Sequence, residues 1–168
     1  NDSIDGKRIL ISGSGNVAVY AAEKAIMEGG IVLTLSDTSG CLYDKKGLDP
    51  EKLDHIKKVK FNRRGRIREI CDELGLDYLE GQTPWSIPAD IAMPCATQNE
   101  ISLQDATALI RNQCIAIVEG ANMPTEQAAI DAFAEAGVLF APSKAANAGG
   151  VAVSGLEMSQ NSLRMSWT

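Results

Sequence analysis

The chain of 168 residues has little of what builds membrane spans, metal centres or nucleic-acid interfaces. No apolar run approaches the roughly 20 residues that a membrane-spanning helix needs. There is one histidine, His55, and the closest of the four cysteines, Cys95 and Cys114, are 19 residues apart, so we expect no metal site. The 16 basic and 22 acidic residues give a net charge of -6, which argues against nucleic acid or an anionic membrane surface as a partner.

The cysteines and the first residues of the chain indicate the cellular compartment of the protein. The four cysteines form no CxxC pair, and we expect them to be reduced thiols in a cytoplasmic protein. The first residues, NDSIDGKR, do not resemble a signal peptide. Because the chain is acidic, a bound phosphate would have to be held by local geometry and not by a general positive field.

Short apolar runs alternate with longer helical stretches, which predicts one α/β domain with a mostly parallel sheet and helices on both faces. The runs expected to be strands buried on both faces are Arg8–Ser12, Ile31–Ser36, Asp90–Met93, Ile115–Glu119 and Val138–Ala141. The expected helices are Val17–Glu28, one beginning after Asp49, one with Ile67, Ile70, Cys71 and Leu74 on one face, one from Ser102 to about Arg111, and Glu126–Ala136. We also expect a small hairpin of Cys41–Tyr43 and Lys45–Leu48 around Asp44.

A glycine motif lies directly after the first expected strand and directly before the first expected helix. It is GSGNVA at Gly13–Ala18, which has the pattern G-x-G-x-x-A. The first glycine allows a tight turn, and Gly15 lets the backbone approach a pyrophosphate. The N–H groups and the positive end of the helix dipole then face the phosphates. In this context the motif predicts a Rossmann-like, doubly wound fold that binds a dinucleotide; a glycine-rich turn in another α/β domain is the alternative.

The residues alone leave the choice between NAD and NADP open. Asp37 follows the second strand 22 residues after Gly15, near the spacing of a carboxylate that binds the ribose of NAD. A basic cluster that could neutralise the 2′-phosphate of NADP comes later in the chain. It consists of Lys57, Lys58, Lys60, Arg63, Arg64 and Arg66. The alternative for most of these six is a solvated helix face.

Four segments resemble a known family when they are taken together. They are SGSGNVA at Ser12–Ala18, PCATQNE at Pro94–Glu100, EGANMPT at Glu119–Thr125 and SKAANAGGVAVSGLEMSQN at Ser143–Asn161. The chain closely resembles the cofactor-binding domain of the hexameric glutamate dehydrogenases, within the wider family of glutamate, leucine, phenylalanine and valine dehydrogenases. The resemblance runs through nearly the whole chain. It implies an enzyme that interconverts glutamate with 2-oxoglutarate and ammonia, using NAD(P).

The resemblance also implies the roles of individual residues. The cofactor-binding residues would be Gly13, Ser14, Gly15, Asn16, Val17, Ser36, Asp37, Lys60, Ala96, Thr97, Gln98, Gly120, Ala121, Asn122 and Asn147. Val151 and Ser154 would lie near the substrate side chain. Asn122 would bind the nicotinamide ribose, unless it is a turn-capping asparagine; Ser154 would bind the far carboxylate of glutamate, unless it bonds to a carbonyl one turn earlier. Ser36, Asp37 and Lys60 look more like the NADP-preferring branch, so NADP is the expected cofactor, with NAD as the alternative.

The family's catalytic lysine and aspartate lie in an amino-terminal domain that these residues do not resemble. We therefore expect residues 1–168 to be a single NAD(P)-binding domain that binds cofactor without turning over substrate, from a parent enzyme that is a homohexamer. Removal of a partner domain would expose apolar surface and favour weak self-association. The family's sheet has one strand reversed. The rival interpretations are the cofactor domain of another amino-acid dehydrogenase and a non-catalytic dinucleotide-sensing module.

Overall fold

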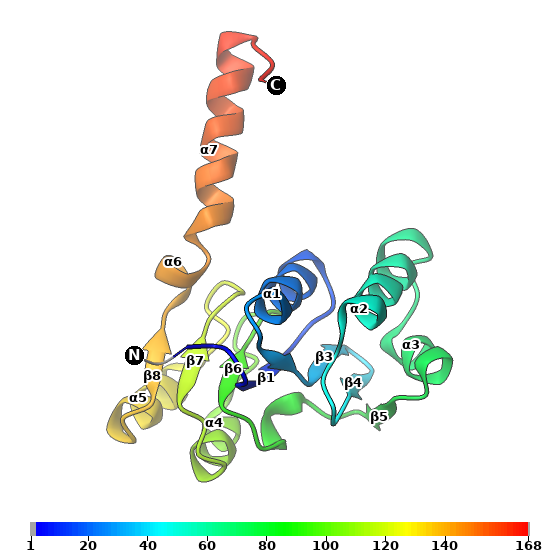
Figure 1. Cartoon of the computed structure of the whole chain (residues 1–168). Helices are drawn as coiled ribbons and strands as arrows, with labels where there is room; N and C mark the ends of the chain where they lie inside the picture. Colours follow the sequence, from blue (N-terminus) through cyan, green and yellow to red (C-terminus); the bar gives the residue numbers. More distant parts are fainter. Residues whose placement is uncertain (1–2, 168) are drawn as a thin grey trace.

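A parallel five-stranded sheet forms the centre of the computed structural model, which describes residues 3–167 (Figure 1). Its strands, in spatial order, are β2 (Ile31–Val32), β1 (Arg8–Ile11), β6 (Ile91–Met93), β7 (Ala116–Val118) and β8 (Leu139–Ala141). Every neighbouring pair in this sheet is parallel. The expected α/β fold with a mostly parallel sheet is confirmed.

A second, three-stranded sheet corrects two predictions. Its strands are β3 (Thr34–Asp37), β4 (Gly40–Tyr43) and β5 (Asp77–Glu80). The run Ile31–Ser36 is not one strand: it divides at Leu33, so that its first part pairs with β1 and its second part with β4. The predicted hairpin around Asp44 is also wrong, because β4 turns back onto β3 and residues 45–48 form no strand. Strand β4 is antiparallel to both of its neighbours, and is thus a reversed strand of the kind that the resemblance implied.

Helices cover both faces of the central sheet, as Figure 1 shows. On one side lie α1 (Asn16–Met27), which packs on the central sheet, then α2 (Pro50–Lys57) and the π-helical turn η1 (Lys58–Asn62), and α3 (Ile67–Leu74), which packs on β4 and β5 of the second sheet. The other face carries the 3-10 turn η2 (Pro84–Ser86), α4 (Leu103–Arg111) and α5 (Gln127–Glu135). Successive side chains of β1 serve the two cores in turn: Ile9 and Ile11 pack on the first face and Leu10 on the second. All three are fully buried, as the period of two along a strand requires.

The polar residues predicted to begin and end helices do so. Asp49 accepts a hydrogen bond from the Lys52 N–H at 2.8 Å and caps α2. Ser102 and Asp105 form a capping box at the start of α4, and Gly75 ends α3 in the left-handed conformation. These signals are local to the chain, so they could be recognised without knowledge of the fold.

The last part of the chain is much more exposed than the rest. Strand β8 is an edge strand and Leu139 is 72% exposed, so the prediction that this run is buried on both faces is wrong. After a short helix, α6 (Ser143–Ala146), the chain continues as α7 (Ala148–Leu163), which extends away from the sheet in Figure 1 and buries none of its residues. Within residues 3–167, no helix is long and apolar enough to cross a membrane.

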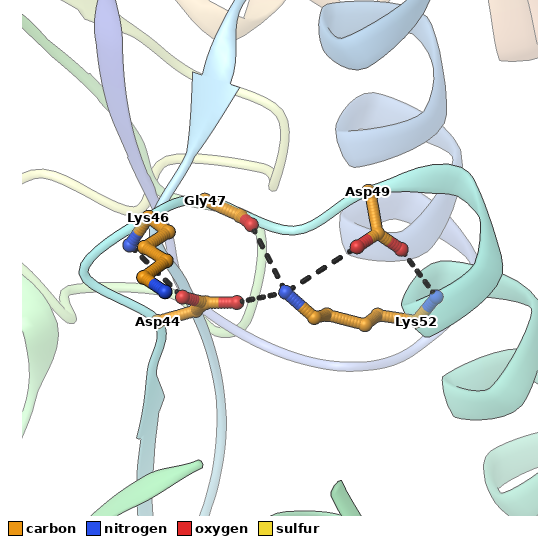
Figure 2. Close-up of polar contacts among 5 residues, drawn as sticks. All are labelled: Asp44, Lys46, Gly47, Asp49 and Lys52. Atoms are coloured by element: carbon orange, nitrogen blue, oxygen red, sulfur yellow. Dashed lines mark hydrogen bonds and ion pairs between the residues drawn. The ribbon is translucent and has the colours of Figure 1, made fainter.

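Lys52 and two carboxylates hold the loop that joins β4 to α2 (Figure 2). The ammonium group of Lys52 lies 2.7 Å from Oδ2 of Asp44 and 3.3 Å from Oδ2 of Asp49. Asp44 is buried, and its Oδ1 accepts a hydrogen bond from the Lys46 N–H at 2.9 Å. The hydrogen bond with Asp44 raises the pKa of Lys52 above its ordinary 10.5. These contacts of Asp44, Asp49 and Lys52 hold residues 45–48 in a loop, so that they do not form a strand.

Asp44→Ala is expected to lower the free energy of unfolding by about 2–3 kcal/mol, because Lys52 would be left half-buried without its main partner. Denaturation with urea measures this change. Asp49→Ala, which removes an exposed helix cap, is the matched control, with an expected loss of about 1 kcal/mol. Because the pKa of Lys52 is higher in the folded chain than its ordinary 10.5, its ion pair contributes fully to the free energy of unfolding below pH 10.5. This contribution is lost only as the pH rises further. Equal losses for the two variants would contradict a special role for the buried pair.

Candidate functional site

The first glycine of the motif occupies a place where no side chain fits. Gly13 has a φ of +80°, and a Cβ added to it would lie 3.0 Å from the carbonyl oxygen of Cys95. Its N–H donates to Oγ of Ser36 at 2.8 Å, and its carbonyl accepts from the Ser36 N–H at 2.9 Å. The loop after β1 is therefore fixed between β3 and the loop after β6.

The second glycine of the motif faces open space. A Cβ on Gly15 would meet no atom within 4 Å, and its φ of -84° is one that any residue can adopt. Gly15 is the N-cap of α1, where no side chain caps the helix and no acidic residue lies in the first turn. The N–H groups of that turn thus remain available to an anion in front of the loop.

Two adjoining cavities lie in front of this loop, at the carboxyl ends of the parallel strands. The first, of about 490 Å³, is lined by Gly13, Ser14, Gly15, Ser36, Asp37, Thr38, Gly40, Arg66, Gly81, Gln82, Thr83, Cys95, Ala96, Thr97 and Glu100. The second, of about 580 Å³, is lined by Val17, Cys95, Ala96, Gln98, Gly120, Ala121, Asn122, Asn147 and Val151. They meet at Cys95 and Ala96. The chain leaves β1 toward one side of the sheet and β6 toward the other, and ligands of open α/β folds bind at such a switch point.

The carboxylate of Asp37 is held by backbone groups at one end of the first cavity. Its Oδ1 accepts from the Ser39 N–H at 2.9 Å, and its Oδ2 accepts from the Ile67 N–H at 3.0 Å. Ile67 is the first residue of α3, so the aspartate favours the start of that helix. Asp37 thus fixes the position of α3 beside the cavity.

Arg66 is the cation that this arrangement brings to the first cavity. It is the N-cap residue of α3, and its Nη1 lies 3.3 Å from Oγ1 of Thr38. Lys60 is not among the lining residues; its ammonium group donates to the carbonyl of Gly65 at 3.0 Å. The sequence placed six cations near this region but gave no basis for choosing Arg66 among them.

Two asparagines join at the far end of the second cavity. The Nδ2 group of Asn147 lies 2.8 Å from Oδ1 of Asn122, 3.1 Å from the carbonyl oxygen of Gly120 and 3.4 Å from that of Ala121. These contacts engage the acceptor of Asn122 and leave its amide N–H groups as donors beside the cavity. Side chains 25 residues apart in the chain are thus assembled into one polar site.

Most of the predicted site residues line one cavity or the other. Asn16, Lys60 and Ser154 do not. Val151 and Ser154 lie in the first turns of α7, as expected, but only Val151 reaches the second cavity. Burial raises the pKa of the Cys95 thiol to about 12, so this residue is a neutral part of the wall and no nucleophile. Within residues 3–167, no group of three or more His, Cys, Asp or Glu could hold a metal ion.

Comparison with known proteins finds relatives along the whole chain. The family model of the glutamate/leucine/phenylalanine/valine dehydrogenases matches residues 1–168. A protein of Salmonella typhimurium named NADP-specific glutamate dehydrogenase is 58% identical over 163 residues, which are 97% of this chain and 36% of that protein. A protein of Xylanibacter ruminicola named NAD(P)-specific glutamate dehydrogenase is 54% identical over 167 residues, 99% of this chain and 38% of that protein.

The solved structures agree with these matches. The crystal structure of Plasmodium falciparum glutamate dehydrogenase superposes with a TM-score of 0.93 at 43% sequence identity, covering 99% of this chain and 36% of that one. The chain thus spans little more than a third of the length of the relatives that it matches. The match of the family model to all 168 residues, together with the glycine motif at Gly13–Ala18 and the two cavities in front of it, shows that the chain belongs to the glutamate/leucine/phenylalanine/valine dehydrogenase family.

Proposed function

We propose that residues 1–168 form the dinucleotide-binding domain of an NADP-preferring glutamate dehydrogenase. The parent enzyme would convert L-glutamate, NAD(P)+ and water to 2-oxoglutarate, ammonia and NAD(P)H. The observation that supports this proposal best is the loop at Gly13–Gly15, where one glycine is required by the fold and the other leaves open space in front of a helix start. The names of the relatives support the choice of glutamate as the substrate.

The residues present fit a dinucleotide. The helix start and the loop N–H groups suit a pyrophosphate, and the amides of Asn122 and Asn147 suit the polar groups of a ribose or a carboxamide. When bound, the nicotinamide supplies the centre that exchanges hydride. The part of this chain is to orient that group at the carboxyl edge of the sheet and to exclude water from it.

A preference for NADP is supported by the surroundings of the first cavity. Both oxygens of Asp37 accept backbone hydrogen bonds, which offset its charge. Arg66, which lines the same cavity, is a suitable partner for a 2′-phosphate. Lys60 stays a predicted contributor: from its present position it can hold the carbonyl of Gly65 and thereby the turn that presents Arg66. Relatives named NADP-specific and NAD(P)-specific both occur, so NAD is the alternative.

We propose that the chain by itself does not oxidise glutamate. Val151 and Ser154 on α7 would contribute to the substrate side, with Ser154 suited to an acidic side chain, yet both are exposed. Hydride transfer needs the substrate held against the nicotinamide by groups on both sides of a cleft. Binding of glutamate or 2-oxoglutarate would therefore require the rest of the parent enzyme, for which a homohexamer is the prediction. A cytoplasmic location also stays a prediction from the sequence.

Parallel calorimetric titrations of the 168-residue chain with NADPH and NADH test the proposal. We expect both to bind, and NADPH at least about tenfold more tightly, because a charge-assisted hydrogen bond contributes about 1.5–3 kcal/mol. Lys60→Ala should lower the affinity for NADPH by about tenfold and leave the affinity for NADH within about twofold of the parent. An assay with glutamate and NADP+ should show no turnover.

The outcomes separate the parts of the proposal. Equal affinities, or tighter binding of NADH, would mean that the NADP preference is wrong while the dinucleotide site stands. No binding of either nucleotide would contradict the proposed domain function. Glutamate oxidation by the purified chain would contradict its expected inactivity.

A further inference from the structure

One partly buried acid that lines the first cavity has no part in the proposed function so far. Glu100 follows the loop that leaves β6, and it lines the cavity together with Gly13–Gly15 of the loop after β1, which we call the phosphate loop. Its Oε1 accepts from the Ala96 N–H at 2.9 Å and from the Thr97 N–H at 3.3 Å. The next residue, Ile101, is fully buried and its N–H donates to the carbonyl of Pro124 at 2.9 Å, so the backbone that holds Glu100 is fixed.

The hydroxyl of Ser12 acts on the same carboxylate. Its oxygen accepts from the Cys95 N–H at 2.9 Å, and the hydroxyl favours the charged form of Glu100 and so lowers its pKa, against the larger effect of burial. Ser12 is buried and directly precedes Gly13. Glu100 and Ser12 therefore both hold the backbone at Cys95–Thr97, where the two loops of the cavity meet.

The charges around Glu100 do not compensate its own. Asp105 at the start of α4 acts on it as a second negative charge, and the carboxylate of Asp105 is itself held by the N–H and hydroxyl of Ser102. The thiol of Cys95 is neutral, because burial raises its pKa to about 12. Burial, above all, raises the pKa of Glu100 above its ordinary 4.5. Farther along the cavity wall lie Asp37 and Arg66, one of each sign.

We propose that Glu100 is a proton-linked element of the dinucleotide site, which takes up a proton from solvent when an anionic pyrophosphate binds in front of the phosphate loop. This inference rests on the proposed function. An ionised Glu100 places a negative charge in the cavity that an anion must enter. Its protonated form removes the repulsion, can still accept the two amide hydrogen bonds at Oε1, and gains a donor at its other oxygen.

The direction of the pH dependence follows from linkage. A bound anion raises the pKa of Glu100 above its value in the free chain, because it disfavours the charged form. Binding is therefore tightest below the free pKa and weakens as the pH rises through the interval between the free and bound values. Where the exchange of one proton is complete, the dissociation constant rises about tenfold per pH unit, and above the bound value it is constant again.

The test is the number of protons that the 168-residue chain takes up when it binds NADH. Calorimetry in buffers of different ionisation enthalpy measures this number between about pH 5.5 and about pH 8.5. NADH is the probe because it lacks the 2′-phosphate, which itself titrates near pH 6. We expect uptake approaching one proton. Glu100→Gln, which keeps an oxygen acceptor for Ala96 and Thr97, should bind NADH without uptake and about tenfold more tightly than the parent at the alkaline end.

Glu135→Gln is the matched control, because Glu135 is an exposed acid at the end of α5 and lines neither cavity. It should keep the parent's proton uptake. Should Glu100→Gln fail to fold, carboxyl 13C NMR of the parent chain decides the matter, since the pKa of the Glu100 carboxyl must rise when NADH is added. Binding of NADH without uptake, or uptake that persists in folded Glu100→Gln, would overturn the role of Glu100 while leaving the dinucleotide site in place. A chain that binds neither nucleotide would overturn both.

Discussion

Gly15→Val is expected to lower the affinity for NADPH and NADH by at least about 100-fold while the chain stays folded. The new side chain meets no protein atom, because the space around the Cβ position is open to 4 Å. Its backbone, with φ -84° and ψ -169°, suits a β-branched residue. The branched side chain would occupy the front of the loop and keep a pyrophosphate from the N–H groups behind it. Loss of two charge-assisted hydrogen bonds from these N–H groups to the pyrophosphate lowers the affinity by about 100-fold or more.

Calorimetry measures the affinities, and thermal unfolding measures the fold. Valine is a poorer N-cap than glycine, so a loss of about 1 kcal/mol of stability is expected. Gly149→Val is the matched control, since Gly149 also faces open space but lines neither cavity; it should leave both affinities unchanged. Gly13→Ala should instead damage folding and binding together, because φ is +80° and the carbonyl of Cys95 is in the way. Binding by Gly15→Val within about threefold of the parent would contradict the placement of the pyrophosphate.

This contrast between the two glycines shows which features a sequence can predict. The turn, the helix start and the strand before them lie within about ten residues, and each is specified by residues that are neighbours in the chain. The same holds for the cap at Asp49 and for the left-handed end at Gly75, both of which the structure confirms. A local pattern of this kind needs no knowledge of where the rest of the chain lies.

The features that were predicted wrongly depend on distant partners. The run Ile31–Ser36 divides because β1 pairs with its first half and β4 with its second, which no pattern within the run reveals. Residues 45–48 form a loop because Asp44 binds Lys52, eight residues away, in a partly buried ion pair. Strand β5, which completes the second sheet, was not predicted, because its residues are half-exposed at an edge and show no continuous apolar run.

The cofactor preference falls between these two cases. The carboxylate of Asp37 has the spacing of a ribose ligand, yet in the structure it accepts a hydrogen bond from Ile67, 30 residues away, and serves the start of α3. The spacing rule therefore identified a residue that does line the first cavity. It did not reveal which groups donate hydrogen bonds to the carboxylate oxygens of that residue. The basic cluster, likewise, contains Arg66, which lines the first cavity, together with five cations that do not.

Arg66→Ala is expected to lower the affinity for NADPH by about 10- to 100-fold and to leave the affinity for NADH within about twofold of the parent. Arg66 lines the cavity beside Ser36 and Thr38, and its guanidinium can bind a phosphate through two nitrogens. Such a charge-assisted contact contributes about 1.5–3 kcal/mol, which corresponds to the stated loss. Titration of both nucleotides at two salt concentrations measures it, because loss of a phosphate contact also reduces the salt dependence of NADPH binding.

Arg68→Ala separates position from charge. Arg68 is the second residue of α3. Its guanidinium is directed to Glu80, 3.4 Å away, and to the ring of Tyr78, and it lines neither cavity. Its removal changes the net charge by the same amount and should leave the ratio of NADPH to NADH affinity unchanged. An equal loss for both variants would mean that the general field of the basic segment sets the preference. A loss of NADH affinity as large as that of NADPH in Arg66→Ala would instead mean that Arg66 acts on the shape of the cavity, because NADH has no 2′-phosphate for it to bind.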